Sequence, residues 1–342
     1  MSSTPKTCKI SKGTTLEELA NFFNLTNEQL KRYHNTYCPL DDLIGYDIPE
    51  HVTIVYVPPE DKELREKIFN PNGGKFIKYK NKNTLDNQKS YHKRYGVIQK
   101  MFHNNEPKIS IHYETELKKQ NSKIELIRKS AYINEQKPDL IIEQIADKVG
   151  NIFYPLELQM YDNGTIKEIT SIKEIQSKWS KLKPDLEDYY KGEEAGKLFQ
   201  RIDRQLKYEG RILRKMNDSI FNLLFFVPLY ETFNDDKTYT FKLEVPFSSE
   251  KHKMIFEIIL SINEEISKTH KFIVKAVGKY IYKNFRNETK TFSPHENQTE
   301  GYFDFTYKLN SKDNSIFSVF GEMGVKSPKL DNKITFECYE QS

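Results

Sequence analysis

The chain has 342 residues, a length that predicts two or three folding units because a single core rarely grows so large. Its 53 basic and 49 acidic residues nearly balance, and 22 Phe and 21 Tyr supply bulky apolar surface, which argues against whole-chain disorder and against a dedicated nucleic-acid or membrane binder. Only 14 Gly and 14 Pro exclude collagen-like and low-complexity classes.

The first sixty residues are expected to form a small unit of strand, helix, helix and strand. Residues 7–11 have the pattern of a short strand, and Thr14 or Thr15 is placed to cap a helix after it. Thr26 is placed to cap a second helix, and residues 52–57 form a β-branched strand that stops at two prolines. The first helix is indicated by apolar residues at helical spacing: Leu16, Leu19, Ala20 and Phe23.

This segment resembles a LysM domain. The resemblance rests on the run ISKGTTLEELA from Ile10 to Ala20, on the later residues Phe23, Asn24, Leu25, Thr26, Leu30 and Asn35, and on the closing strand from Ile54 to Pro58. It covers a small part of the chain but spans the whole module, so residues 1–60 are expected to be a LysM domain.

The resemblance implies a shallow groove that binds N-acetylglucosamine polymers such as peptidoglycan or chitin. Its walls in the family are the loop before the first helix and the loop after the second. Carried over by position, one wall would contain Gly13, Thr14, Thr15 and Leu16, and the other Asn35, Thr36 and Tyr37.

Two departures from the family pattern weaken the expectation of a glycan ligand. Thr14 stands where the family usually has an acidic residue, and Pro49-Glu50-His51 stands where it usually has Pro-Gly-Gln. The loop between the second helix and the closing strand also carries apolar residues that suit a protein contact: Tyr37, Leu40, Leu43, Ile44 and Tyr46. Packing of this loop on itself is the alternative that the sequence leaves open.

Residues 61–100 are expected to be a basic linker. Between residues 75 and 100 there are eight basic residues against one acid, Asp86, and four aromatic residues are interleaved with them. Charge combined with stacking surface suits single-stranded nucleic acid, and the same charge suits an acidic protein surface. A solvated connector is the preferred interpretation, because Asn, Gly and Pro are frequent in this stretch.

Residues 101–342 are expected to form an α+β domain in which helices pack on an antiparallel sheet. Asp162-Asn163-Gly164 is a tight hairpin signal, and Ser171 with Glu174 has the spacing of a capping box. Helices are predicted over about 171–226 and 254–267. The first region is expected to include a long helix between residues 198 and 224, whose basic face is expected to be solvated. Strands are predicted at 108–113, 139–145, 152–160, 165–169, 238–245, 271–277, 301–309, 316–320 and 334–339.

One arrangement in the sequence suggests enzyme chemistry. Asp139 and Glu157 loosely resemble the carboxylate spacing of PD-(D/E)xK nucleases, in which two acids and a lysine hold a metal, but Gln159 occupies the lysine position. The sequence has no HExxH, no Cys/His cluster with zinc spacing and no glycine-rich phosphate loop. We therefore expect a binding protein without a metal or cofactor, with a metal-dependent nuclease as a remote alternative.

The compartment is expected to be the cytoplasm. The longest apolar run, residues 223–227, is too short to span a membrane, and the first twelve residues have no apolar core of a signal peptide. The three cysteines, Cys8, Cys38 and Cys338, form no CxxC pair and are expected to be reduced structural thiols.

The leading hypothesis is a non-catalytic bacterial adaptor or assembly protein in a contractile injection apparatus such as type VI secretion. This setting follows from the LysM resemblance, because LysM modules without export signals also occur in tail, baseplate and spike components. The alternative is a peptidoglycan-binding protein that a dedicated secretion machine exports, for example as an effector. The sequence leaves open the partner, the oligomeric state and the order of residues 75–100.

Overall fold

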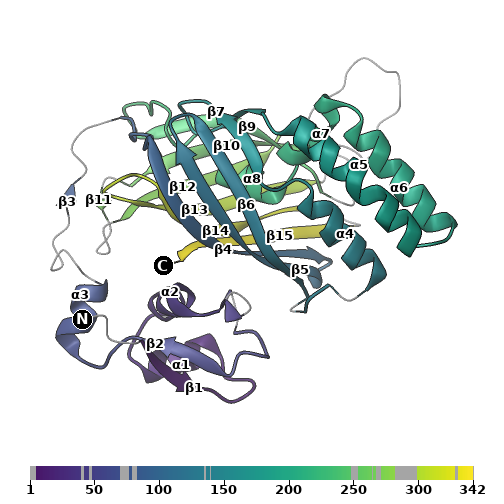
Figure 1. Ribbon diagram of the computed structural model, residues 1–342. Coiled ribbons are helices and arrows are strands. Elements are labelled where there is room, and N and C mark those ends of the chain that lie inside the picture. Colours follow the sequence, from purple (N-terminus) through teal and green to yellow (C-terminus); the bar gives the residue numbers. More distant parts are fainter. Residues whose placement is uncertain are drawn as a thin grey trace.

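The computed structural model describes residues 5–39, 42–45, 48–69, 77–78, 83–134, 136–138, 140–247, 253–263, 265–266, 271–281, 299–327 and 330–341. Figure 1 shows three parts: a small amino-terminal unit, a large curved sheet and a group of helices that projects from it.

The amino-terminal unit contains β1 (Lys6–Lys9), α1 (Leu16–Phe22), α2 (Asn27–Tyr37) and β2 (Ile54–Val57), and β1 pairs antiparallel with β2. The observed order is the predicted strand, helix, helix and strand. Thr15 caps α1 and Thr26 caps α2, each through a reciprocal capping box with the residue three positions later. A further helix, α3 (Lys62–Phe69), follows this unit. The buried core of the unit consists of Leu16, Leu19, Ala20, Leu30, Ile44, Val52, Val55 and Val57.

Within the described residues, the sheet has eleven antiparallel strands in the order β8-β7-β6-β5-β4-β15-β14-β13-β12-β10-β9. The α+β class and the antiparallel sheet expected from the sequence are therefore observed. Two short strands, β3 (Ile77–Lys78) and β11 (Glu265–Ile266), pair separately. The strands of the sheet are β4 (Ser90–His103), β5 (Glu106–Gln120), β6 (Lys123–Ile133), β7 (Leu156–Met160), β8 (Ile166–Ile169), β9 (Thr238–Val245), β10 (Met254–Ile262), β12 (Lys271–Tyr280), β13 (Glu300–Asn310), β14 (Ile316–Ser327) and β15 (Leu330–Gln341).

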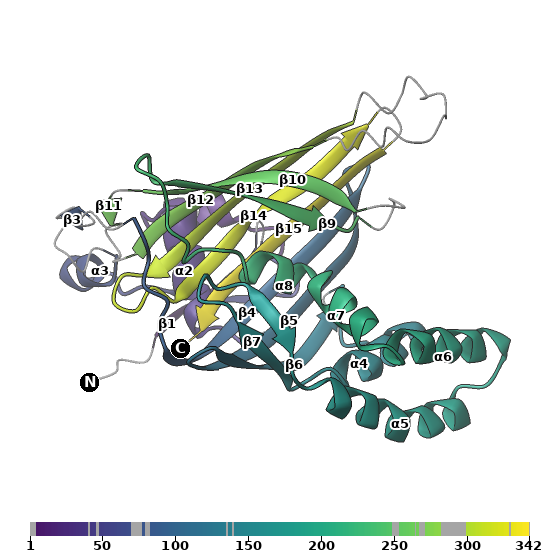
Figure 2. The same ribbon diagram turned by 90° about the horizontal axis from the view of Figure 1, so that it is seen from above.

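In the part of the chain that the structure describes, five helices accompany the sheet: α4 (Ile141–Asn151), α5 (Ile172–Tyr189), α6 (Glu193–Leu206), α7 (Glu209–Asn217) and α8 (Ile220–Phe225). The sheet curves around α8, while α4 to α7 form a projecting group that we call the helical arm (Figure 2). The Tyr307 hydroxyl donates to the Leu224 carbonyl at 2.8 Å, and the Phe225 ring meets the Tyr95 ring edge to face. Helix α8 thus fills the concave face of the sheet with aromatic side chains.

The predicted helix at 254–267 is wrong, because residues 254–262 form strand β10. Its residues alternate between buried and more exposed positions, and Phe256, Ile258 and Leu260 are completely buried in the core. This period of two is that of a strand, and four of its nine residues are β-branched isoleucines that favour strands.

Three further elements differ from their predictions. Residues 141–145 of the expected strand at 139–145 form the start of α4, and the expected long helix between residues 198 and 224 is divided into α6, α7 and α8. Ser171 forms no capping box, because its hydroxyl instead accepts a hydrogen bond from the Glu157 amide at 3.0 Å. That contact ties the start of α5 to strand β7.

Residues 61–100 do not form a linker throughout. They include α3 and the first part of β4, which lies in the middle of the sheet between β5 and β15. Tyr95 is completely buried and donates to the Ile316 carbonyl at 2.7 Å, and Tyr91 packs against the same core, so these rings are not stacking surface for nucleic acid. Lys75, Lys80 and Lys82 lie outside the described residues.

The amino-terminal unit packs on the convex face of the sheet. Along β15, Phe336 and Cys338 point into the core around α8, whereas Glu337 and Tyr339 point the other way and meet Lys31 of α2. Alternate residues of β15 therefore contact two different parts of the chain, α8 on one face of the sheet and α2 on the other.

Candidate functional site

A shallow groove opens on the amino-terminal unit, with a volume of about 250 Å³. One wall is the turn between β1 and α1, which contains Gly13, Thr14 and Thr15 and continues into Leu16 at the start of α1. The other wall is the segment before β2, which contains Pro49. We call this the amino-terminal groove, and its complete lining is Ile10, Ser11, Lys12, Gly13, Thr14, Thr15, Leu16, Ile48, Pro49, Glu50 and Val52.

Local hydrogen bonds fix the turn that forms the first wall. Thr14 donates to the Ser11 carbonyl through both its amide, at 3.1 Å, and its hydroxyl, at 2.8 Å. Gly13 has a φ of +88°, a left-handed conformation that residues with a side chain adopt at a cost. The turn therefore depends on Gly13 for its backbone conformation and on Thr14 for its hydrogen bonds.

An ion pair connects the two walls of the amino-terminal groove. Lys12 and Glu50 lie 2.8 Å apart, and both side chains are exposed. The hydrogen bond and charge of Lys12 lower the pKa of the Glu50 carboxyl, and those of Glu50 raise the pKa of the Lys12 ammonium. The groove thus offers a ligand one exposed cation and one exposed anion beside the backbone of the turn.

The structure does not bring Asn35, Thr36 and Tyr37 to this groove. Asn35 is buried and bridges both backbone groups of Ile44: its amide donates to the carbonyl at 2.8 Å, and its oxygen accepts from the amide at 2.9 Å. Thr36 donates to the Arg32 carbonyl one turn earlier. Tyr37 is partly exposed but packs beside other tyrosines. The second wall of the groove is instead residues 48–52.

The loop that was expected to contact another protein contacts this chain instead. Ile44 is completely buried in the core of the amino-terminal unit, and Leu43 packs with Cys38 against Ile98 of β4. A methyl group added at Gly96 of β4 would lie 2.6 Å from the Leu43 side chain, so the glycine permits this close approach. Leu43 and Ile44 are therefore not available to an external partner, and Leu40 and Tyr46 lie outside the described residues.

Charged contacts complete the attachment of the amino-terminal unit to the sheet. Lys31 of α2 lies 2.9 Å from Glu337 of β15, and both side chains are largely buried, at 12% and 4% exposure. Glu337 also accepts a hydrogen bond from the Tyr339 hydroxyl. A second pair joins Glu28 of α2 to Lys308 of β13. Any movement of the unit that separates Lys31 from Glu337 would leave a buried charge unpaired, so this pair favours one fixed orientation of the unit.

His34 of α2 is completely buried, and it contacts the loop between α2 and β2. Its Nδ1 accepts from the Tyr56 amide at 3.1 Å, which places the proton on Nε2, and Nε2 donates to the Asp42 carbonyl at 2.8 Å. Burial lowers the pKa of His34 to about 4. The imidazole is therefore neutral at physiological pH and holds the loop to β2.

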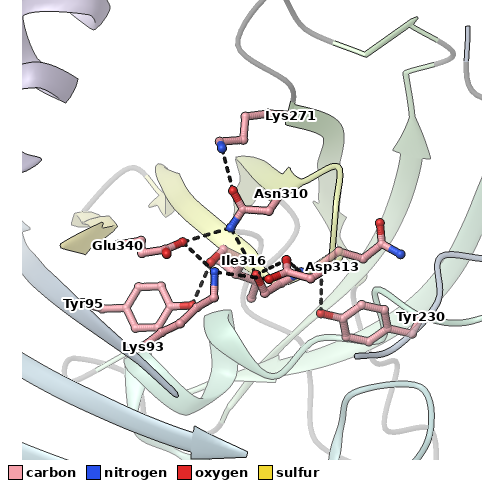
Figure 3. A network of polar contacts seen from close by, with 10 residues as sticks. Lys93, Tyr95, Tyr230, Lys271, Asn310, Asp313, Ile316 and Glu340 are labelled. Carbon is pink, nitrogen blue, oxygen red and sulfur yellow. Dashed lines mark hydrogen bonds and ion pairs between the residues drawn. The ribbon is translucent and has the colours of Figure 1, made fainter. Parts of the chain in front are cut away.

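A polar network lies at one end of the sheet (Figure 3). Lys93 lies 2.9 Å from Glu340 and 3.7 Å from Asp313, and Asn310 donates to the same Glu340 oxygen at 3.0 Å. Lys271 donates to Asn310 at 2.5 Å, and burial lowers the pKa of its ammonium to about 8. The network ties the ends of β4, β12, β13 and β15 to the turn that contains Asp313.

The residues of the nuclease alternative do not form a metal site in the described structure. Asp139 lies outside the described residues, and Glu157 is exposed on β7, where its backbone contacts Ser171. Within the described ranges, no group of three or more His, Cys, Asp or Glu side chains is close enough together to hold a metal ion. All three cysteines are free thiols. No helix in these ranges is both long and apolar enough to cross a membrane.

Comparisons with known proteins add little to this geometry. No protein-family model matches the chain, and no curated protein matches it. One similar solved chain comes from a structure described as lipid-protein interactions in lipovitellin, with 10% sequence identity and a TM-score of 0.43. The match covers 75% of this chain but only 25% of that chain. At this level the likeness identifies neither a family nor a ligand.

Proposed function

We propose that this protein is a non-catalytic adaptor that binds a partner protein through the amino-terminal groove. The observation that carries the proposal is the orientation of the amino-terminal unit. Its loop around Leu43 and its helix α2 are used against the sheet, while the turn from Ser11 to Thr15 stays open. The resemblance of this unit to LysM domains, which are binding modules, supports the same interpretation.

The attachment to the sheet suits an adaptor. A unit on a free linker would search for its partner independently of the remainder, whereas a docked unit holds its groove at a constant position relative to the helical arm. The buried Lys31–Glu337 pair and the Leu43 contact supply this rigidity. The setting that we propose is a bacterial contractile injection apparatus of the type VI secretion kind, in which LysM modules fasten one component to another.

The test is affinity capture from a lysate of the source organism, with the wild-type chain and a Ser11→Trp variant as baits. Ser11 is exposed, and only its backbone carbonyl supports the turn, so the substitution fills the groove without removing a side-chain contact. A Lys62→Trp variant on α3 is the matched control, because Lys62 is exposed and does not line the groove. The proposal predicts a protein that is recovered with the wild type and the control and is lost with Ser11→Trp. Recovery of muropeptides alone would contradict it.

The second candidate function is binding of peptidoglycan or another N-acetylglucosamine polymer. The open groove itself favours it, because backbone groups of the turn and the Lys12–Glu50 pair offer hydrogen bonds to hydroxyl and acetamido groups. Co-sedimentation with purified sacculi tests this candidate. Sedimentation that Ser11→Trp abolishes and Lys62→Trp preserves would favour it, whereas a wild-type chain that stays in the supernatant would exclude it.

A further inference from the structure

An apolar groove of about 780 Å³ opens on the helical arm, between the start of α4 and the first half of α6. Leu140, Ile141 and Ile142 contribute consecutive large side chains that are 60%, 65% and 58% exposed. Leu198 of α6 lines the opposite side, with Ile145 at the base. Three adjacent aliphatic side chains in water are unfavourable unless something covers them, and such a patch marks an interaction surface. We call this the arm groove.

A row of basic side chains borders the arm groove. Lys197, Arg201 and Arg204 are spaced at i, i+4 and i+7 and therefore share one side of α6. Lys197 is neutralised by Glu193 at 2.7 Å and Glu194 at 2.9 Å.

The arginines of this row are not neutralised in the same way. Within the described residues, neither Arg201 nor Arg204 lies within 4.0 Å of a carboxylate, and the side-chain hydrogen bond of Arg204 goes to the Gln200 carbonyl. Arg211 of α7 extends the row, because its guanidinium donates to the Arg204 carbonyl at 2.8 Å. Uncompensated positive charge thus runs beside an apolar floor.

We propose that the arm groove binds one amphipathic helix of a partner protein, with the apolar stripe of that helix in the groove and its acidic residues facing Arg201 and Arg204. A helix presents a row of side chains at i, i+3, i+4 and i+7 that enters a concave apolar groove, and opposite charge at the rim sets its orientation. This inference rests on the proposed function and extends it, because it gives the adaptor a second binding surface with a defined partner chemistry.

Two other classes of partner fit the arm groove less well. A protein inserts a convex apolar surface into a bilayer, whereas the surface of the arm groove is concave. Nucleic acid bases stack on aromatic side chains, whereas the floor is made of Leu and Ile. Both classes are outcomes of the test below.

The first experiment is selection of displayed helical peptides against the purified chain. Every peptide carries the same apolar stripe at i, i+3, i+4 and i+7, and the flanking positions vary among acidic, neutral and basic residues. The inference predicts enrichment of peptides with acidic flanks. Enrichment of neutral or basic flanks, or no enrichment at all, would overturn it.

The second experiment measures the affinity of an enriched acidic peptide for groove variants by fluorescence anisotropy. Ile142→Asp and Arg201→Glu are each expected to weaken binding about tenfold or more, since they remove a central contact of a small interface. The matched controls are Leu64→Asp, at an exposed leucine of α3, and Lys173→Glu, at an exposed cation of α5, and both should bind as the wild type does. Equal losses in the variants and the controls would reject the arm groove as the site.

A charge exchange keeps the test informative if a variant folds poorly. The double variant Arg201→Glu/Arg204→Glu should prefer a peptide of the same stripe with basic flanks over the acidic peptide. An unchanged preference for the acidic peptide would contradict the assigned orientation.

Sedimentation with phosphatidylcholine vesicles that contain about 25% phosphatidylserine tests the bilayer, and binding to an oligonucleotide tests nucleic acid. Binding of either that Ile142→Asp abolishes would replace the helix as the occupant.

The outcomes separate this inference from the proposed function. Ser11→Trp should bind the acidic peptide as the wild type does, because Ser11 lines the amino-terminal groove and not the arm groove. If no peptide is selected but a Ser11-dependent protein partner is captured, the inference fails and the proposed function stands. If peptides bind the arm groove but no protein depends on Ser11, the proposed function fails and the arm groove remains a docking site.

Discussion

At the scale of single residues, His34 shows how a buried imidazole links pH to the attachment of the loop before β2. In the folded chain its pKa is about 4, well below its ordinary value of 6.5, because burial disfavours the charged form. The neutral ring accepts from Tyr56 and donates to Asp42. A protonated ring has no acceptor to offer the Tyr56 amide.

The stability that His34 contributes is therefore complete above about pH 6.5 and is lost as the pH falls through about 4. The difference corresponds to about 3 kcal/mol over that interval. Urea unfolding of the wild type and a His34→Gln variant, measured from pH 7.5 to pH 4, checks this prediction. The variant lacks the titrating imidazole but keeps all other titrating groups, so the difference in unfolding free energy between the two proteins isolates the contribution of His34. An equal decrease in unfolding free energy for both proteins would show that His34 does not carry the effect.

The buried pair between Lys31 and Glu337 gives a second prediction. Lys31→Met leaves the Glu337 carboxylate at 4% exposure without its cation, and we expect a loss of roughly 3 kcal/mol in the free energy of unfolding. The double variant Lys31→Met/Glu337→Met should recover part of this loss, since neither buried charge remains. Chemical denaturation of the three proteins checks the pattern. A double variant that is less stable than Lys31→Met, rather than more stable, would indicate that the two residues act independently.

Residue roles were predictable where the cause is local. Thr15 and Thr26 could be recognised as helix caps because the partner of each cap lies three residues away. Asn35 was assigned to the groove, but its partner is the backbone of Ile44 nine residues later, and no local pattern marks such a contact. Ser171 shows the opposite case, in which a capping pattern is present but a tertiary contact with Glu157 uses the hydroxyl.

At the scale of elements, the contact between the amino-terminal unit and β4 depends on Gly96. A methyl group there would lie 2.6 Å from the Leu43 side chain, closer than packed atoms allow. We expect Gly96→Ala to destabilise this contact by about 1–3 kcal/mol, as overpacking of a tight site does. Amide hydrogen exchange should consequently speed up in α2 and in the loop after it, with little change in β12 and β13.

The matched control for this prediction is Gly210→Ala in α7. No atom lies within 4 Å of a methyl group added at Gly210, and alanine favours a helix more than glycine does. This control should leave exchange in α2 unchanged. Unaltered exchange in Gly96→Ala would mean that the Leu43 contact does not hold the amino-terminal unit on the sheet.

The elements that were mispredicted share a physical cause. Strand β10 is apolar enough to fit a helical pattern as well as a strand, and only its neighbours β9 and β12 decide between the two. Strand β4 carries lysines that favour a solvated connector, yet Lys93 is 10% exposed because it pairs with Glu340 and Asp313 at the end of the sheet. Pairing across the sheet thus overrides the local preference in both segments.

At the scale of the whole molecule, the sequence predicts an antiparallel sheet and a small unit before it, but not their assembly. The pairing of β15 with β4 joins segments more than 200 residues apart, and it creates the convex surface on which α2 packs. Glu337 faces α2 and Phe336 faces α8, and these opposite directions depend on this pairing. For the same reason the sequence could indicate the loop around Leu43 as a contact surface without indicating that its partner is the chain itself.

The arm groove and the amino-terminal groove lie on different parts of this assembly, and an adaptor requires that the two act independently. Quantitative mass spectrometry of proteins captured by the wild type, Ser11→Trp and Ile142→Asp measures this directly. We expect the wild type to recover two different proteins, Ser11→Trp to lose one of them and Ile142→Asp to lose the other. Loss of the same single protein in both variants, or recovery of glycan fragments without any protein that depends on either residue, would contradict the account.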